Sequence, residues 1–117
     1  MGGLREIIEA FDAGGLVRGA AIIGEDGLVI HDALMPGADG DAVAALAVTT
    51  MRHAEQFGGA STSGPLRTAV FDFGAGPAIL SALTPSATLV VLAQPDQDIG
   101  PLLYELRTRQ DTLTGLL

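Results

Sequence analysis

Short apolar segments, separated by joints rich in glycine, proline and aspartate, run along most of the chain and limit what it can fold into. Such joints end helices and strands, so each segment must be a short element of its own. Five segments have the length and composition of strands, and they cover residues 17–23, 28–33, 66–73, 78–83 and 88–93. Their spacing predicts one hairpin followed by a three-stranded meander.

Three further segments carry apolar residues at helical spacing, near residues 4–11, 42–57 and 99–113. Asp39 or Asp41 can cap the second helix, and Asp96 or Asp98 can cap the third. The order of elements is helix, two strands, helix, three strands, helix. This order predicts an α+β fold in one domain, residues 1–117, with a five-stranded antiparallel sheet.

Charge and composition exclude several classes of function. The 117 residues include 14 acidic and 6 basic side chains, a net charge of −8, and no cysteine or lysine. Nucleic-acid binding needs a basic face, and disulfides, cysteine-ligated zinc and Schiff bases need the missing residue types. No apolar run approaches the ~20 residues of a membrane span, and no signal peptide is recognisable. We expect a cytoplasmic protein that binds neither nucleic acid nor membranes.

The predicted helix at residues 42–57 has small or apolar side chains on two sides. One side, which we expect to cover the sheet, gathers Val43, Leu46, Ala47, Thr50, Ala54 and Phe57. The reverse side carries Ala45, Val48 and Thr49, followed by Arg52. Because so short a chain has few elements left to cover this second side, we expect another chain to cover it. The alternative is a monomer in which the terminal helix lies across this one.

No motif predicts a catalytic, metal or cofactor site. Residues 59–64 have the outer spacing of a phosphate-binding loop, but proline and leucine follow where lysine and serine or threonine are required. His31 and Asp32 are neighbours on a strand, so their side chains point to opposite faces. His53 has no second histidine four residues away with which to hold a metal. We therefore expect no enzyme activity and no cofactor.

Residues 17–30, the alanine-rich stretch 42–47, and residues 89–93 followed by Asp98-Ile99-Gly100 resemble the roadblock family. This family comprises relatives of dynein light chains and includes bacterial proteins of the MglB type. The resemblance extends from Leu4 to about Arg109. It implies a roadblock/profilin-like sandwich with the order αββαβββα. It also implies a two-fold dimer in which the middle helices pair and the third strands join two sheets into one.

The resemblance also implies which surfaces are used. The implied homodimer interface consists of Ala45, Val48, Thr49 and Arg52 on the helix and Leu66, Thr68 and Val70 on the following strand. Met51 and Glu55 are then candidates for binding a further partner.

Proteins of this family bind small Ras-like GTPases. The implied function is therefore a non-catalytic homodimeric regulator or adaptor that binds an MglA-type GTPase. One alternative is a structural scaffold module of a signalling assembly with no nucleotide-dependent partner. A small-molecule sensor would require a deep polar pocket, and pairing with a paralogous subunit stays open beside pairing with a second copy.

Overall fold

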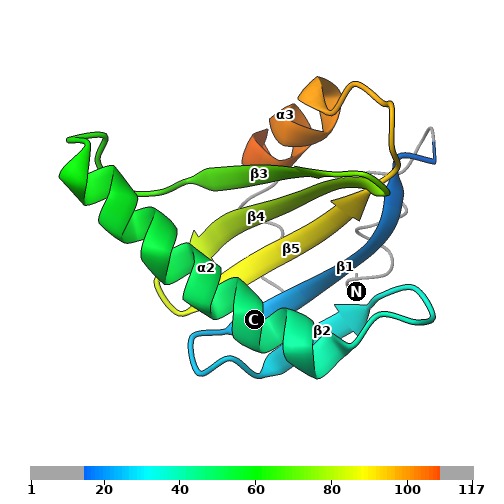
Figure 1. The fold of residues 1–117 in the computed structure, drawn as a ribbon, viewed down its shortest axis with the longest axis horizontal. Helices are drawn as coiled ribbons and strands as arrows, with labels where there is room; N and C mark the ends of the chain where they lie inside the picture. The colour runs from blue at the N-terminus through cyan, green and yellow to red at the C-terminus, as the bar shows by residue number, and fades with distance from the viewer. Residues whose placement is uncertain (1–14, 109–117) are drawn as a thin grey trace.

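The computed structural model describes residues 15–108, which form a five-stranded antiparallel sheet with a helix on each face (Figure 1). The strands are β1 (Val17–Gly24), β2 (Val29–Ala33), β3 (Thr68–Phe73), β4 (Gly76–Thr84) and β5 (Ala87–Ala93), and the helices are α2 (Gly40–Ala60) and α3 (Gly100–Thr108). The predicted α+β class and its five-stranded antiparallel sheet are confirmed. The predicted helix at residues 4–11 lies outside the described residues, as does the predicted third helix beyond residue 108.

One strand pairing joins the predicted hairpin to the predicted meander. The order across the sheet is β2-β1-β5-β4-β3, so β1 and β5 are neighbours although β2, α2, β3 and β4 lie between them in the sequence. Their pairing runs from Val17 opposite Ala93 to Gly24 opposite Ala87. β1, β5 and β4 bury side chains on both faces, which explains why their sequences are almost uninterrupted apolar runs. β2 and β3 are left as the edges of the sheet.

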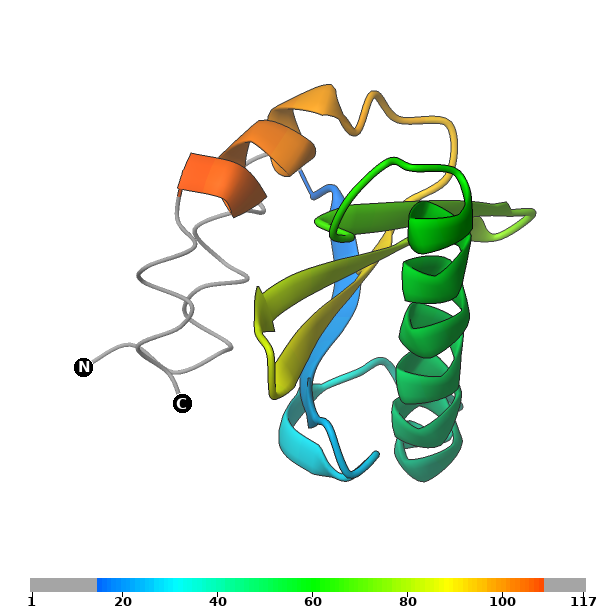
Figure 2. The same ribbon diagram turned by 90° about the vertical axis from the view of Figure 1, so that its left-hand side faces the viewer.

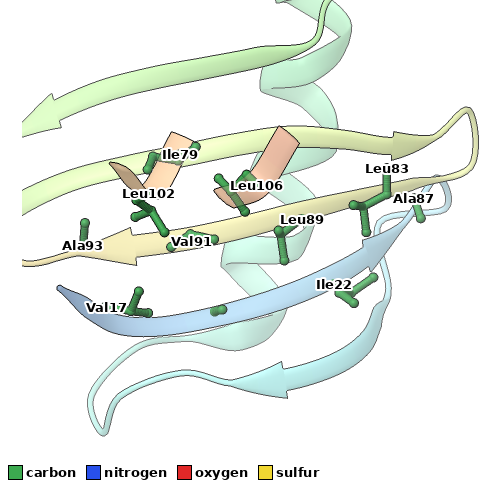
Figure 3. Close-up of a cluster of buried hydrophobic side chains, with 11 residues drawn as sticks. Val17, Ile22, Ile79, Leu83, Ala87, Leu89, Val91, Ala93, Leu102 and Leu106 are labelled. Atoms are coloured by element: carbon green, nitrogen blue, oxygen red, sulfur yellow. The ribbon is translucent and has the colours of Figure 1, made fainter. Parts of the chain in front are cut away.

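The two helices cover opposite faces of the sheet (Figure 2). On one face, Ala44, Ala47 and Met51 of α2 belong to a buried cluster with side chains of β1, β4 and β5. On the other face, Leu102 and Leu106 of α3 pack over a second cluster from the same strands (Figure 3). Alternate residues of each strand point to opposite faces, so each central strand supplies both clusters.

The buried stripe of α2 only partly agrees with the predicted one, since Ala47 is buried and Val43 packs against the core as expected. Leu46 and Phe57 were expected to cover the sheet, but they are 64% and 75% exposed. The buried residues are instead Ala44, Ala47 and Met51, at positions i, i+3 and i+7. Two alanines on this stripe let the helix lie close to the sheet, whereas the bulkier Leu46 and Phe57 point away from it. The prediction was wrong for Leu46 and Phe57 because it gave the sheet the side with the larger apolar residues.

Aspartates begin both helices. The Asp39 carboxylate accepts a hydrogen bond from the Ala42 N–H at 3.1 Å, and that of Asp98 accepts one from the Gly100 N–H at 2.9 Å. Each predicted pair of capping candidates is thus reduced to one residue. Among the residues that the structure describes, no helix has the length and apolar content needed to span a membrane.

A substitution at Gly76 can test how closely the central strands pack. Its φ is +130°, and a Cβ atom added there would collide with the Ala93 carbonyl oxygen on β5. We expect Gly76→Ala to lower the free energy of unfolding by ~2–4 kcal/mol, because both the strained backbone and the collision must be relieved. Urea unfolding followed by circular dichroism measures this loss. Gly74→Ala in the same hairpin, where a Cβ meets open space, is the matched control with an expected change below ~0.5 kcal/mol. Equal losses in the two variants would contradict the assignment.

Candidate functional site

The residues considered for chemistry lie apart from one another. His31 lies on β2 and His53 on α2, and within residues 15–108 no three metal-ligating side chains gather at a common point. The loop at residues 59–64 ends α2: the Ser61 hydroxyl donates to the Phe57 carbonyl at 2.8 Å, and the Ser63 N–H donates to the Gly58 carbonyl at 2.8 Å. These bonds give the loop a structural role as a helix terminus.

Exposed apolar side chains gather on one flank of α2 and on β3. Leu46 and Phe57 share a flank with Thr50 and His53, since these residues follow one another at i, i+4, i+7 and i+11. On β3, Val70 is 44% exposed.

Phe57 and Val70 line the same hollow of about 660 Å³ between the end of α2 and β3. We call this hollow, together with the flank of α2 that leads to it, the α2/β3 surface and define it by Leu46, His53 and Phe57 on the helix and Thr68 and Val70 on the strand. Adjoining exposed apolar side chains mark an interaction site more strongly than scattered ones do.

The outer edge of β3 is an open strand edge. The Ala82 N–H donates to the Arg67 carbonyl at 3.0 Å, which identifies these two residues as a hydrogen-bonded pair. By the alternation of an antiparallel ladder, the backbone groups of Thr68, Val70 and Asp72 then point away from β4. In the part of the chain that the structure describes, β3 pairs with β4 alone. Such an edge is a ready template for another strand.

The four helix residues predicted for the dimer interface lie on the other flank of α2. Ala45, Val48, Thr49 and Arg52 line a hollow of about 530 Å³ between α2 and the turn from β1 to β2. A neighbouring hollow of about 600 Å³ shares Val48 and Arg52 and reaches the turn from β4 to β5. We call these two hollows together the α2/turn groove.

The seven residues predicted for the dimer interface therefore do not form one surface. The four on the helix line the α2/turn groove, whereas Thr68 and Val70 lie on the α2/β3 surface. Leu66 is half-buried and lines hollows on both sides of the helix. The sequence analysis missed Leu46 and Phe57 as surface residues. The spacing of Ala44, Ala47 and Met51 could have predicted their exposure. Two small residues at helical spacing indicate the side of a helix that packs closely, and Leu46 and Phe57 lie off that side.

The two partner-binding candidates differ in accessibility. Met51 is 8% exposed and belongs to the core cluster beneath α2. Its contribution to any partner is limited to atoms at the rim of the α2/turn groove, so it is foremost a core residue. Glu55 is exposed and lines the same groove.

Two arginines converge where β3 begins. Arg67 and Arg107 line a hollow of about 470 Å³ with Thr68, Ser81, Leu66, Ala82 and Leu106. Both arginines are exposed, and neither guanidinium forms a hydrogen bond or ion pair with another of the described residues. We call this site the arginine hollow. It brings two cations together on a chain whose net charge is −8.

Comparison with solved structures shows where this fold occurs. A Roadblock/LC7 domain from Streptomyces avermitilis aligns with a TM-score of 0.79 at 21% identity, over 92% of this chain and 91% of that chain. Myxococcus xanthus MglB aligns with a TM-score of 0.81 at 12% identity, over 94% of this chain and 87% of that one. A structure of MglB with a tetrameric arrangement aligns at 0.79 and 14% identity, over 99% and 92%. At these identities the likeness shows a shared fold.

The sequence comparison identifies the family itself. No curated protein sequence matches the chain. A model of the Roadblock/LC7 domain, however, matches residues 5–93, which include all five strands and α2. The resemblance noted from the sequence is thereby confirmed. The chain belongs to the Roadblock/LC7 domain family.

Proposed function

We propose that the chain is a homodimeric regulator or adaptor that binds a small Ras-like GTPase. Membership of the Roadblock/LC7 domain family supports this function, since the resemblance to roadblock proteins implies such a partner. The observation that carries the proposal is the α2/β3 surface. It combines an exposed apolar helix flank with an open strand edge, so it offers both hydrophobic contact and unpaired backbone groups to another chain.

In the proposed homodimer, α2 packs against α2 of the second copy and β3 pairs with its counterpart. A two-fold axis presents the same surface from both sides, so the surface must complement itself. Leu46 and Phe57 lie 11 positions apart, or roughly 16 Å along the helix axis. An antiparallel helix pair brings Leu46 of one copy toward Phe57 of the other, so both exposed side chains are buried.

Dimerisation through the α2/β3 surface leaves the α2/turn groove of each copy free. Arg52 and Glu55 place opposite charges along its helical wall, Val48 supplies an apolar contact, and Glu25 lies on the far side. The net charge of −8 favours a partner that presents basic residues. We assign this groove to the GTPase.

Two neighbouring substitutions on α2 separate the two flanks. We expect Leu46→Arg to weaken the dimer at least ~10-fold, because it places a charge in a desolvated contact. Ala45→Arg introduces the same side chain one residue earlier, on the α2/turn groove, and should leave the dimer intact. Light scattering after size-exclusion chromatography measures both, and circular dichroism confirms that both variants fold. A dimer lost with Ala45→Arg but kept with Leu46→Arg would support the interface predicted from the sequence instead. A monomeric wild type would remove the homodimer altogether.

Binding to a GTPase is tested with the small Ras-like GTPases encoded in the same genome, each loaded with GDP or with a non-hydrolysable GTP analogue. We expect calorimetry to show binding to one of them that depends on the nucleotide. Glu55→Arg should weaken this binding at least ~10-fold, because it sets a positive charge against the basic surface of the partner, and should leave the dimer unchanged. Gln97→Arg, at an exposed position between β5 and α3, is the control that adds positive charge elsewhere. Binding that is indifferent to the nucleotide would favour the scaffold alternative, and no binding in either state would contradict the proposal.

A further inference from the structure

Opposite charges lie at the two ends of β3, since Arg67 directly precedes the strand and Asp72 lies near its end. We infer that Asp72 of each copy occupies the arginine hollow of the other copy, and that this contact sets the register of β3 pairing with Val70 on the two-fold axis. The inference rests on the proposed homodimer and adds to it a residue pair that selects the partner strand.

The backbone of β3 favours one register. The outward-pointing groups belong to Thr68, Val70 and Asp72, as the hydrogen bond between Ala82 and Arg67 requires. In a strand pair related by a two-fold axis perpendicular to the sheet, the central residue lies opposite its own copy. With Val70 at the centre, Val70 faces Val70 and Thr68 faces Asp72, so all outward groups pair and form about six hydrogen bonds.

In the two adjacent registers, fewer of the outward-pointing backbone groups of β3 find a hydrogen-bond partner. An axis at Ala69 would place Asp72 opposite Leu66, which lies before the strand begins. An axis at Phe71 would place Thr68 opposite Gly74, which lies in the turn after the strand. Each alternative retains about four of the hydrogen bonds between strand residues. The Val70 register is therefore favoured before side chains are considered.

The side chains then bring Asp72 of the second copy to Arg107. Val70 lies opposite Ile79, whose side chain belongs to the cluster beneath α3, and Thr68 lies opposite Ser81. Residues that face one another across a ladder share a face of the sheet. In the Val70 register, Asp72 of the second copy therefore lies beside Thr68 on the α3 side. Thr68 lines the arginine hollow.

The charges of the two sites are complementary. In its own copy, exposed Asp72 lines a small hollow with a second carboxylate, Asp96, and no cation. In the other copy, it approaches Arg107, which lines the hollow together with Thr68 and has no ion-pair partner among the described residues. Arginine and carboxylate form strong charge-assisted hydrogen bonds, and opposite charges across a ladder stabilise it. A two-fold axis repeats the contact, so two identical ion pairs would stabilise each dimer.

The same contact discriminates between partners. A strand that lacks an acidic residue at the position of Asp72 would leave Arg107 unpaired beside an apolar interface, which disfavours that strand. A parallel arrangement of two β3 strands would bring the Asp72 carboxylates together, and like charges opposite one another destabilise a ladder. Self-recognition in the antiparallel sense follows from this pattern of charge.

Charge reversal in the full chain tests the inference. Asp72→Arg and Arg107→Asp should each raise the dissociation constant of the dimer at least ~10-fold, because each variant sets like charges together twice. The double variant restores opposite charges and should return to within ~3-fold of wild type. Sedimentation equilibrium over a range of protein concentrations and salt measures all four proteins. Asp72→Asn, which removes charge without reversal, should abolish most of the salt dependence.

A control variant distinguishes failure of the ion pair from failure of the homodimer itself. Glu25→Arg makes the same change of charge as Asp72→Arg in the turn between β1 and β2, away from β3, and should leave the dissociation constant unchanged. A wild-type dimer that is insensitive to Asp72→Arg, or a double variant that stays weak, would overturn the ion pair and leave the homodimer standing. If Glu25→Arg weakens the dimer and Asp72→Arg does not, the result would indicate that the dimer interface lies at the α2/turn groove. A monomeric wild type would overturn both proposals.

Discussion

The pairing of β1 with β5 is the interaction on which the rest of the structure depends. It joins a hairpin that ends at Ala33 to a meander that begins at Thr68, and neither unit alone provides a sheet broad enough to bury both helices. The paired strands supply side chains to both clusters, one beneath α2 and one beneath α3. Gly76 permits the close approach of β4 to this central pair, because any side chain there would meet the Ala93 carbonyl of β5.

The central pairing also determines which groups are left for other chains. Once β1 and β5 occupy the middle, β3 must be an edge, and its outward backbone groups have no partner among residues 15–108. α2 crosses the sheet on a stripe of alanines, so its larger apolar residues Leu46 and Phe57 point outward. An exposed strand edge with an apolar neighbour invites uncontrolled association. In the proposed homodimer, two β3 edges close on each other, which removes this hazard at β3.

Much of the fold could be predicted from the sequence because its signals are local. Gly- and Pro-containing joints bounded the strands to within two residues, and Asp39 and Asp98 marked the helix starts. Which side of α2 is buried against the sheet could not be predicted in the same way, because it depends on how closely the helix approaches the sheet. Hydrophobicity alone does not distinguish Leu46, which is exposed, from Met51, which is buried. The arginine hollow depends on distant parts of the chain as well, since α3 supplies Arg107 and the β3–β4 register supplies Ser81.

The positions of the charged residues determine how the net charge of the chain affects its association. A net charge of −8 resists the association of identical molecules, so a homodimer needs an interface where that repulsion is offset locally. In the proposed homodimer, Arg107 beside the start of β3 and Asp72 near the end of the same strand convert repulsion into attraction in the antiparallel register centred on Val70. The acidic remainder of the surface then opposes further growth at other places. Under the proposed arrangement, the acidic charge of the chain therefore favours one partner geometry over others.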